Sequence, residues 1–236
     1  MGVEDFWDAR YRVNDDSSVA EEGPVLAAAL AHFGDVAGRT VLDLGCGMGR
    51  SSLFFAQRGA RVIAVDVSRV AVERLTRLCA ERGIDNVQAV HASAFEIDRL
   101  GPVDYAFGAM ILHHLEPFDE FVRVLRAAVV PGGRAFFYEN SAMSRLLVWF
   151  REHVVGRAWV PKEGDDEEFP LTPGEVDLLR RHFSVRVEYP ELLFFRLVSD
   201  YLLRGRLQAP FAWADRVGHR IPALRRLSYR QYLYLG

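Results

Sequence analysis

Thr40-Val41-Leu42-Asp43-Leu44-Gly45-Cys46-Gly47-Met48-Gly49-Arg50-Ser51-Ser52 is the stretch that decides the fold. An apolar run ends in three glycines that alternate with other residues, and a helix-like segment, Leu53 to Arg58, follows directly. This order predicts a buried strand, a tight turn and the start of a helix. Glycine tolerates a positive φ and lets a ligand approach the main chain, and the first N–H groups of a helix would point at that ligand. The stretch therefore predicts a ligand-binding turn in an α/β domain.

The spacing of the glycines distinguishes between two kinds of ligand. A dinucleotide fingerprint has the form G-x-G-x-x-G, whereas Gly45, Gly47 and Gly49 alternate here and Asp43 precedes them. The form D-x-G-x-G-x-G resembles motif I of the class I, Rossmann-like methyltransferases that depend on S-adenosylmethionine (SAM). The resemblance implies that Asp43, Gly45, Cys46, Gly47 and Gly49 bind the cofactor, with Asp43 accepting a hydrogen bond from the SAM ammonium group, directly or through water. Taken alone, the motif leaves a structural glycine turn in another α/β domain open.

A second acidic residue follows at a spacing typical of ribose recognition. Residues 60–66 read as a buried strand that ends in Asp66, 21 residues after Gly45. An acid about 20 residues past the turn, at the end of the next strand, holds a ribose diol in this class of fold. We expect Asp66 to do so, with Val67 beside the cofactor. The alternative, Asp66 as the N-cap of a helix over 70–82, is weaker because Ser68 suits that position better.

The next strand, over 86–91, precedes a loop that we expect to meet the adenine ring. Members of the resembled family commonly carry an acidic residue in this loop, but Ser93 stands at that place here. Ser93 can still accept a hydrogen bond, and the main-chain amides of Ala94 and Phe95 can contact the ring edge. We therefore predict that these three residues bind the cofactor.

A strand that begins at Val103 leads into Leu112-His113-His114-Leu115, which resembles a further motif of the family. Gly108 and Ala109 would let the backbone run close to the cofactor. His113 is our candidate general base, because a histidine pKa lies near neutrality and reacting groups lie at the carboxyl ends of strands in open α/β sheets. The alternative is that His113 lines the pocket without chemistry while His114 packs in the core.

The N-terminal string Phe6-Trp7-Asp8-Ala9-Arg10-Tyr11 predicts a short amphipathic helix over 4–12. It is similar to the segment that closes over the cofactor in many small-molecule methyltransferases. The resemblance implies that Tyr11 reaches the ligand, whereas Phe6 and Trp7 are equally well explained as a cap on the core.

Strand and helix patterns alternate five times up to about residue 140, which predicts a parallel sheet with right-handed crossovers. The resemblance implies an α/β, Rossmann-like three-layer sandwich with a mainly parallel seven-stranded sheet, an antiparallel last strand over 229–235 and helical insertions. We expect a single domain over 1–236, with N-terminal lid helices over about 1–34. Pro131-Gly132-Gly133 should separate a helix over 118–129 from the fifth strand.

Two late insertions, about 141–170 and 190–228, are expected to cover the substrate pocket, since long connections are usually functional. The first includes an amphipathic pattern over 144–155 and an acidic loop over 161–168; Thr172-Pro173-Gly174-Glu175 then predicts a helix start. In the second, residues 191–204 predict a largely buried helix with a charged stripe that could pack on the domain, pair with a second copy or, least favoured, rest on a membrane. Pro210 and Pro222 are expected to break up the remainder.

Composition limits the classes of partner. A net charge of −3 argues against broad phosphate neutralisation of nucleic acid. The two cysteines, Cys46 and Cys79, indicate neither a disulfide framework nor a metal site, and favour a reducing cytoplasm. No apolar run reaches membrane-spanning length, and the N-terminus lacks the apolar core of a signal peptide. We therefore predict a cytoplasmic protein with no metal and no stable membrane insertion.

The resemblance implies transfer of a methyl group from SAM to a small organic acceptor, which leaves S-adenosylhomocysteine. Aromatic residues in the two insertions favour a hydrophobic or aromatic acceptor, although they could equally be ordinary core: Trp149, Phe150, Trp159, Phe194, Phe195, Phe211 and Trp213. Two other functions stay open, a non-catalytic SAM-binding or scaffolding protein, for instance a homodimer through helix 191–204, and a nicotinamide oxidoreductase. The glycine spacing and Asp43 disfavour the oxidoreductase.

Overall fold

The computed structural model describes residues 2–13, 23–144, 149, 169–203, 205–225 and 227–236. A seven-stranded sheet forms its centre, with the strand order β3-β2-β1-β4-β5-β7-β6. The strands are β1 (Thr40–Leu44), β2 (Arg61–Asp66), β3 (Val87–His91), β4 (Val103–Ala109), β5 (Val129–Asn140), β6 (Val185–Glu188) and β7 (Arg230–Leu235).

Strands β1 to β5 are parallel, and β7 runs antiparallel between β5 and β6. This arrangement confirms the predicted Rossmann-like fold and its antiparallel last strand. The chain builds outward from β1 to β3 on one side and from β4 to β5 on the other. The sheet therefore has a topological switch point between β1 and β4, where open α/β sheets bind their ligands.

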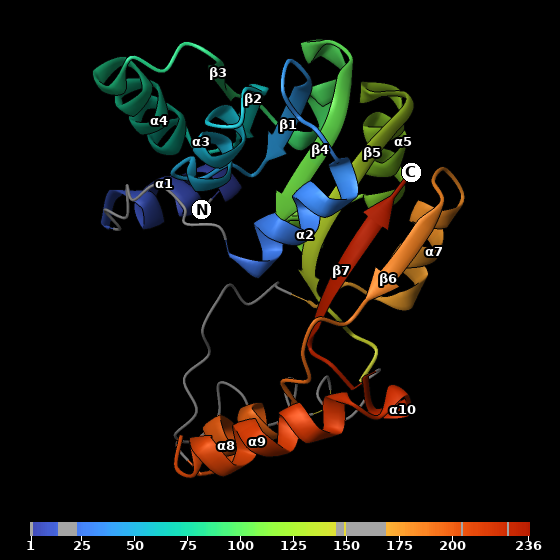
Figure 1. Ribbon diagram of the computed structural model, residues 1–236. Coiled ribbons are helices and arrows are strands. Elements are labelled where there is room, and N and C mark those ends of the chain that lie inside the picture. The colour runs from blue at the N-terminus through green and yellow to red at the C-terminus, as the bar shows by residue number, and fades with distance from the viewer. Residues whose placement is uncertain (1, 14–22, 145–148, 150–168, 204, 226) are drawn as a thin grey trace.

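Helices cover both faces of the sheet, as Figure 1 shows. One face packs against α2 (Pro24–Phe33), α3 (Arg50–Ala56) and α4 (Arg69–Arg82), and the core there includes Phe33, Phe55 and Leu75. The other face packs against η1 (Ala94–Leu100), α5 (Phe118–Ala128) and α7 (Pro173–Arg180). These layers form the predicted sandwich, because buried parallel strands require cover on both faces.

Local signals in the sequence set most helix starts. The Ser68 hydroxyl accepts a hydrogen bond from Ala71 N, so Ser68 is the N-cap of α4 as predicted. Thr172 and Glu175 form the predicted capping box at the start of α7. The Pro-Gly-Gly segment differs from expectation, since it lies inside β5. Val129 already pairs with Val103, and regular pairing resumes at Arg134 after an irregularity.

The second insertion forms three helices, α8 (Phe194–Leu203), α9 (Gln208–His219) and α10 (Pro222–Arg225), which lie below the sheet in Figure 1. The expectation that prolines break up this region is wrong. Pro210 lies in the first turn of α9 and Pro222 is the first residue of α10, positions where no intrahelical N–H bond is lost. Most of the first insertion, including the pattern over 150–155 and the acidic loop, lies outside the described residues.

A buried carboxylate joins α8 to α9. Asp215 of α9 accepts hydrogen bonds from the main-chain N–H groups of Phe195 and Arg196 at 2.8 and 3.0 Å. Arg196, from the predicted charged stripe, also pairs with Glu191 at 2.6 Å. The partner that covers one side of α8 is thus α9 of the same chain. Pairing of two chains through residues 191–204 stays a prediction.

Candidate functional site

A cavity of about 420 Å³ lies at the carboxyl ends of β1, β2 and β4, at the switch point of the sheet. Its size is within the range of small-molecule sites. Eight of the predicted cofactor residues line it: Tyr11, Gly45, Asp66, Val67, Ser93, Ala94, Phe95 and Ala109. These residues come from five separate segments of the chain, which the fold alone brings together.

The Asp66 carboxylate is the principal charged group of the cavity and is almost fully buried. It accepts hydrogen bonds from Gly47 N and Ser68 N, both at 2.8 Å, so it ties the glycine turn to the start of α4. Burial raises the pKa of Asp66, and the two amide donors oppose that effect. A ribose diol placed here would supply two further hydroxyl donors to a carboxylate that burial has deprived of water.

Asp43 does not line the cavity. Its carboxylate is 1% exposed and accepts hydrogen bonds from the hydroxyls of Ser51 and Ser52, at 2.7 and 2.5 Å. Burial raises the pKa of Asp43 to about 6, against the lowering effect of the two hydroxyls. Asp43 therefore holds the first turn of α3 against the end of β1, and its predicted hydrogen bond to the cofactor, directly or through water, stays a prediction.

Four other predicted residues also lie behind the lining. Cys46 packs in the core, and a side chain at Gly49 would come within 2.3 Å of Leu75 Cδ1, so that glycine permits contact between α3 and α4. Gly47 approaches Tyr11, and a side chain at Gly108 would meet Ile111 and Phe137. These glycines serve close packing of the protein itself, which the sequence motif could not distinguish from contact with a ligand.

Helix α1 (Val3–Val13) closes one side of the cavity with Val3, Trp7 and Tyr11. The Tyr11 hydroxyl lies over Gly47, 2.8 Å from where a Cβ would stand there. Burial and the nearby Asp66 carboxylate raise the pKa of Tyr11, so the hydroxyl stays neutral and can donate a hydrogen bond. This placement agrees with the predicted role of Tyr11, and it adds Trp7, which was equally well explained as a core cap.

Ser93 combines a place in the lining with a structural role. Its hydroxyl accepts a hydrogen bond from Phe95 N and its own N–H donates to Glu96, which forms a capping box at the start of η1. The Phe95 amide is consequently engaged within the protein, contrary to the expectation that it reads the adenine edge. The Phe95 ring and Ala94 remain in the cavity wall.

The two adjacent histidines lie in the opposite places from those expected. His113 is 2% exposed at its side chain, and its Nδ1 lies 2.7 Å from Glu139 Oε2 in the core, away from the lining. The other oxygen of Glu139 accepts from Ile111 N and Leu112 N. His114 lines the cavity, with its ring edge-on to Trp7 at 5.5 Å between centroids.

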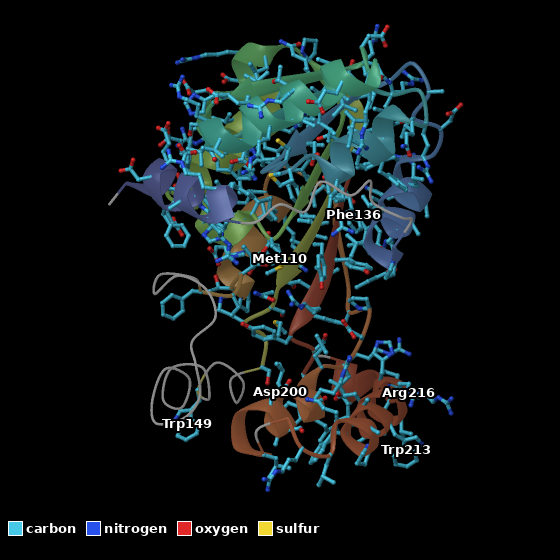
Figure 2. All side chains as sticks on the ribbon, turned by 90° about the vertical axis from the view of Figure 1, so that its left-hand side faces the viewer. Met110, Phe136, Trp149, Asp200, Trp213 and Arg216 are labelled. Atoms are coloured by element: carbon cyan, nitrogen blue, oxygen red, sulfur yellow. The ribbon has the colours of Figure 1, made fainter. Side chains whose placement is uncertain are left out.

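Sequence reasoning missed Trp7, His114, Met110 and Ile111 as lining residues. For Met110 and Ile111, the feature that explains their position is the backbone conformation of Met110. Met110 has φ +57°, unusual for a residue other than glycine, and this turn directs the chain after β4 across the mouth of the cavity. Met110 directly follows β4 and its N–H still donates to the Tyr138 carbonyl of β5 at 2.8 Å, whereas Phe136 lies buried within the core; Figure 2 labels both residues.

No group of three or more side chains that could hold a metal ion occurs among the described residues. The cavity suits SAM instead. Asp66 offers a ribose acceptor, Phe95 and Ala94 an apolar wall for a base, and Gly45 a close backbone approach. The fold is the one that the resemblance to class I, SAM-dependent methyltransferases implies, and the cavity lies where such a fold binds its ligand.

Comparison with known proteins leads to the same class. Residues 41–133 match the family model described as "Methyltransferase domain". A ubiquinone biosynthesis O-methyltransferase from Idiomarina loihiensis is 32% identical over 150 residues, 61% of this chain and 60% of that protein. A cypemycin N-terminal methyltransferase from a Streptomyces species is 43% identical over 125 residues, 51% of this chain and 49% of that protein. The matches thus span less than two thirds of both relatives.

Among solved structures, geranyl diphosphate C-methyltransferase from Streptomyces coelicolor, in complex with S-adenosylhomocysteine, has a similar fold. The TM-score is 0.62 at 15% identity, over 99% of this chain and 95% of that one. The fold of this chain is therefore similar to that of a class I methyltransferase, and residues 41–133 match a methyltransferase domain.

Proposed function

We propose that this protein transfers a methyl group from SAM to a small hydrophobic or aromatic acceptor that enters beside α1. One observation carries the proposal: beside the Asp66 carboxylate, the cavity is lined by the apolar side chains of Val3, Trp7, Met110, Ile111 and Leu115. A carboxylate together with apolar side chains in one cavity suits a cofactor ribose and an apolar acceptor.

The cofactor supplies an activated methyl group on a sulfonium. The contributions of the chain are alignment of the acceptor and exclusion of water, and good alignment alone is worth roughly 7–11 kcal/mol of the barrier. Trp7 and Tyr11 stack at 5.9 Å between ring centroids, which gives the α1 side of the cavity a rigid aromatic surface. A flat aromatic acceptor would gain area against that surface.

The described aromatic residues of the two late insertions lie away from the cavity, so their position gives no support for an aromatic acceptor. None of the described ones lines the cavity, and Trp149 and Trp213 are exposed. Cover of the pocket by the insertions stays a prediction. The relatives' names refer to an O-methyltransferase and an N-terminal methyltransferase, so they support methyl transfer without agreeing on the acceptor atom.

His114 is the residue we propose as the base for acceptors that must lose a proton, in place of His113. His114 lies in the lining, whereas His113 is held by Glu139 and acts as a positioning residue for the segment 111–114. General base catalysis contributes about 10²–10⁴-fold. His114→Phe keeps a ring beside Trp7, so it should lower kcat by such a factor and abolish the pH dependence of the rate. An unchanged pH profile would exclude the base role.

The function is tested with methyl-labelled SAM and an acceptor panel. The panel contains phenols with and without long alkyl chains, polar alcohols and peptides with a free N-terminus. We expect label in the apolar phenols and S-adenosylhomocysteine in equal amount. If SAM binds by calorimetry but no label passes to the panel or to a cell extract, the non-catalytic SAM-binding alternative replaces the proposal.

A further inference from the structure

Large apolar side chains are exposed on the outer surface of α9 and its two ends. Trp213 and Leu207 are each 62% exposed, Ile221 is 49% exposed and Val217 is 38% exposed. Trp213 and Val217 are four residues apart on α9, so they share one face of the helix. Soluble proteins rarely gather such residues on one surface without a partner.

Arginines lie among these apolar residues. Arg206, Arg216, Arg220 and Arg225 are exposed, and Figure 2 shows Arg216 and Trp213 projecting from α9 at the end of the molecule remote from the sheet. Residues 204–226 contain six arginines and one acidic residue, Asp215, in a chain of net charge −3. Asp215 is buried against the start of α8, so it does not neutralise this surface. We call these four apolar residues and four exposed arginines the α9 surface.

We infer that the α9 surface docks on an anionic lipid bilayer, with α9 lying in the plane of the interface. Trp213, Val217, Ile221 and Leu207 would enter the boundary between headgroups and acyl chains, and the arginines would meet lipid phosphates. Tryptophan is favoured at that boundary because it joins a large apolar ring to one N–H donor.

The charge pattern decides between a bilayer and a second copy of this chain. A twofold interface brings the same patch of both copies together, so the four arginines of each copy would gather in one contact. Such a contact places like charges together as the apolar residues are buried, which is unfavourable. A surface of anionic lipid complements both the arginines and the apolar residues. No described helix has the length and apolar content needed to cross a membrane, so the contact is with the surface only.

The test is sedimentation of the full chain with lipid vesicles. We expect binding to vesicles of phosphatidylcholine mixed with phosphatidylglycerol, little binding to phosphatidylcholine alone, and loss of binding in high salt. Each arginine at an anionic surface contributes about fivefold to partitioning. The double variant Arg216→Gln/Arg220→Gln should therefore lower the partition coefficient about 25-fold. Trp213→Ser/Val217→Ser should also lower it, and brominated lipids should quench part of the tryptophan fluorescence of the unchanged protein that this variant lacks.

Two matched variants control for the loss of positive charge and of exposed apolar surface elsewhere on the protein. Arg77→Gln/Arg82→Gln removes two exposed arginines from α4, and Phe169→Ser removes an exposed aromatic ring outside the α9 surface. Both should bind vesicles as the unchanged protein does, and circular dichroism melts check that all variants fold. The inference is overturned if anionic vesicles do not bind the protein, or if the α4 double variant loses as much binding. It is also overturned if light scattering shows a dimer that the Trp213→Ser/Val217→Ser variant abolishes while vesicle binding is absent.

Discussion

Asp8 of α1 accepts a hydrogen bond of 2.5 Å from the hydroxyl of Ser68, which lies 60 residues later at the start of α4. The same Asp8 oxygen accepts from Val70 N at 3.1 Å, and Arg74 donates to the Tyr11 carbonyl at 2.7 Å. The Ser68 hydrogen bond is the main reason why the pKa of Asp8 is lowered. Helix α1 is therefore fastened to α4 by polar contacts, with the cavity enclosed beneath it.

Asp8→Ala should accelerate release of SAM, because α1 forms one wall of the cavity and Asp8 holds that helix to α4. Loss of about 1 kcal/mol of hydrogen bonding corresponds to roughly fivefold faster dissociation, measured by stopped-flow fluorescence of Trp7. Asp5→Ala is the matched control, since Asp5 is an exposed acid on the same helix that accepts only from Gly2 N among the described contacts. Equal rates for the two variants would contradict a fastening role for Asp8.

Gly47→Ala should weaken SAM binding in a manner that depends on Tyr11. The new Cβ would lie 2.8 Å from the Tyr11 hydroxyl oxygen, at a backbone φ of +51°. The positive φ costs roughly 1–2 kcal/mol of stability whichever residue faces it. Tyr11→Phe in the same chain removes the contact atom, so the double variant should recover part of the SAM affinity by calorimetry. If Tyr11→Phe gives no recovery, the tyrosine does not lie over the turn in the bound protein.

Asp66→Ala should weaken binding of S-adenosylhomocysteine at least about tenfold, since hydrogen bonds to a charged group contribute roughly 1.5–3 kcal/mol each. Asp66 also holds Gly47 N and Ser68 N, so loss of affinity alone does not identify a ribose contact. The 2′,3′-dideoxy analogue of S-adenosylhomocysteine separates the two roles. The substitution should cost the analogue much less than the parent ligand, and an equal cost would assign Asp66 a structural role only.

Asp43 makes a distinct contribution to the pH dependence of stability. Its folded pKa of about 6 lies above the usual aspartate pKa of 3.8, so the folded state holds this proton more tightly than the unfolded chain. The contribution of Asp43 to the free energy of unfolding is thus greatest below pH 3.8 and is lost as pH rises through about 6. Over this window the loss is about 3 kcal/mol.

Asp43→Asn removes this titration. Compared with the unchanged protein, the variant should lose less stability between pH 4 and pH 6.5, as measured by urea unfolding at each pH. The relevant quantity is the difference between the two proteins in the slope of unfolding free energy against pH. The absolute stabilities are not compared, because the substitution also alters the bonds to Ser51 and Ser52. Parallel stability curves for the two proteins would exclude a raised pKa at Asp43.

The sequence predicted the sheet well because each strand end carries a local signal. The glycine turn after β1, the acid at the end of β2 and the capping residue Ser68 each act within a few residues of the chain. The predicted cofactor residues that line the cavity follow directly from strand ends at a switch point. The order of strands and helices along the chain was enough to predict that residues such as Asp66 and Ala109 lie at the cavity.

The predictions that the structure contradicts concern features that no local sequence signal determines. Motif glycines are equally suited to a ligand and to a neighbouring side chain, and at Gly49 and Gly108 the neighbour is Leu75 or Phe137. For His113 and His114, adjacent residues point in different directions within a single turn whose geometry no periodicity predicts. Helices α9 and α10 were missed because prolines were interpreted as breakers rather than as first-turn residues.

Strand β7 lies beside β6, and Glu188 pairs with Tyr232, so the chain leaves and re-enters the sheet at neighbouring positions. Neighbouring antiparallel strands are about 5 Å apart, a gap that a two-residue turn spans as readily as a helical segment. The pairing of the sheet therefore places no demand on what is inserted there. This point of the fold is an attachment site at which evolution can lengthen, shorten or replace α8–α10 without altering the half of the protein that holds the methyl donor.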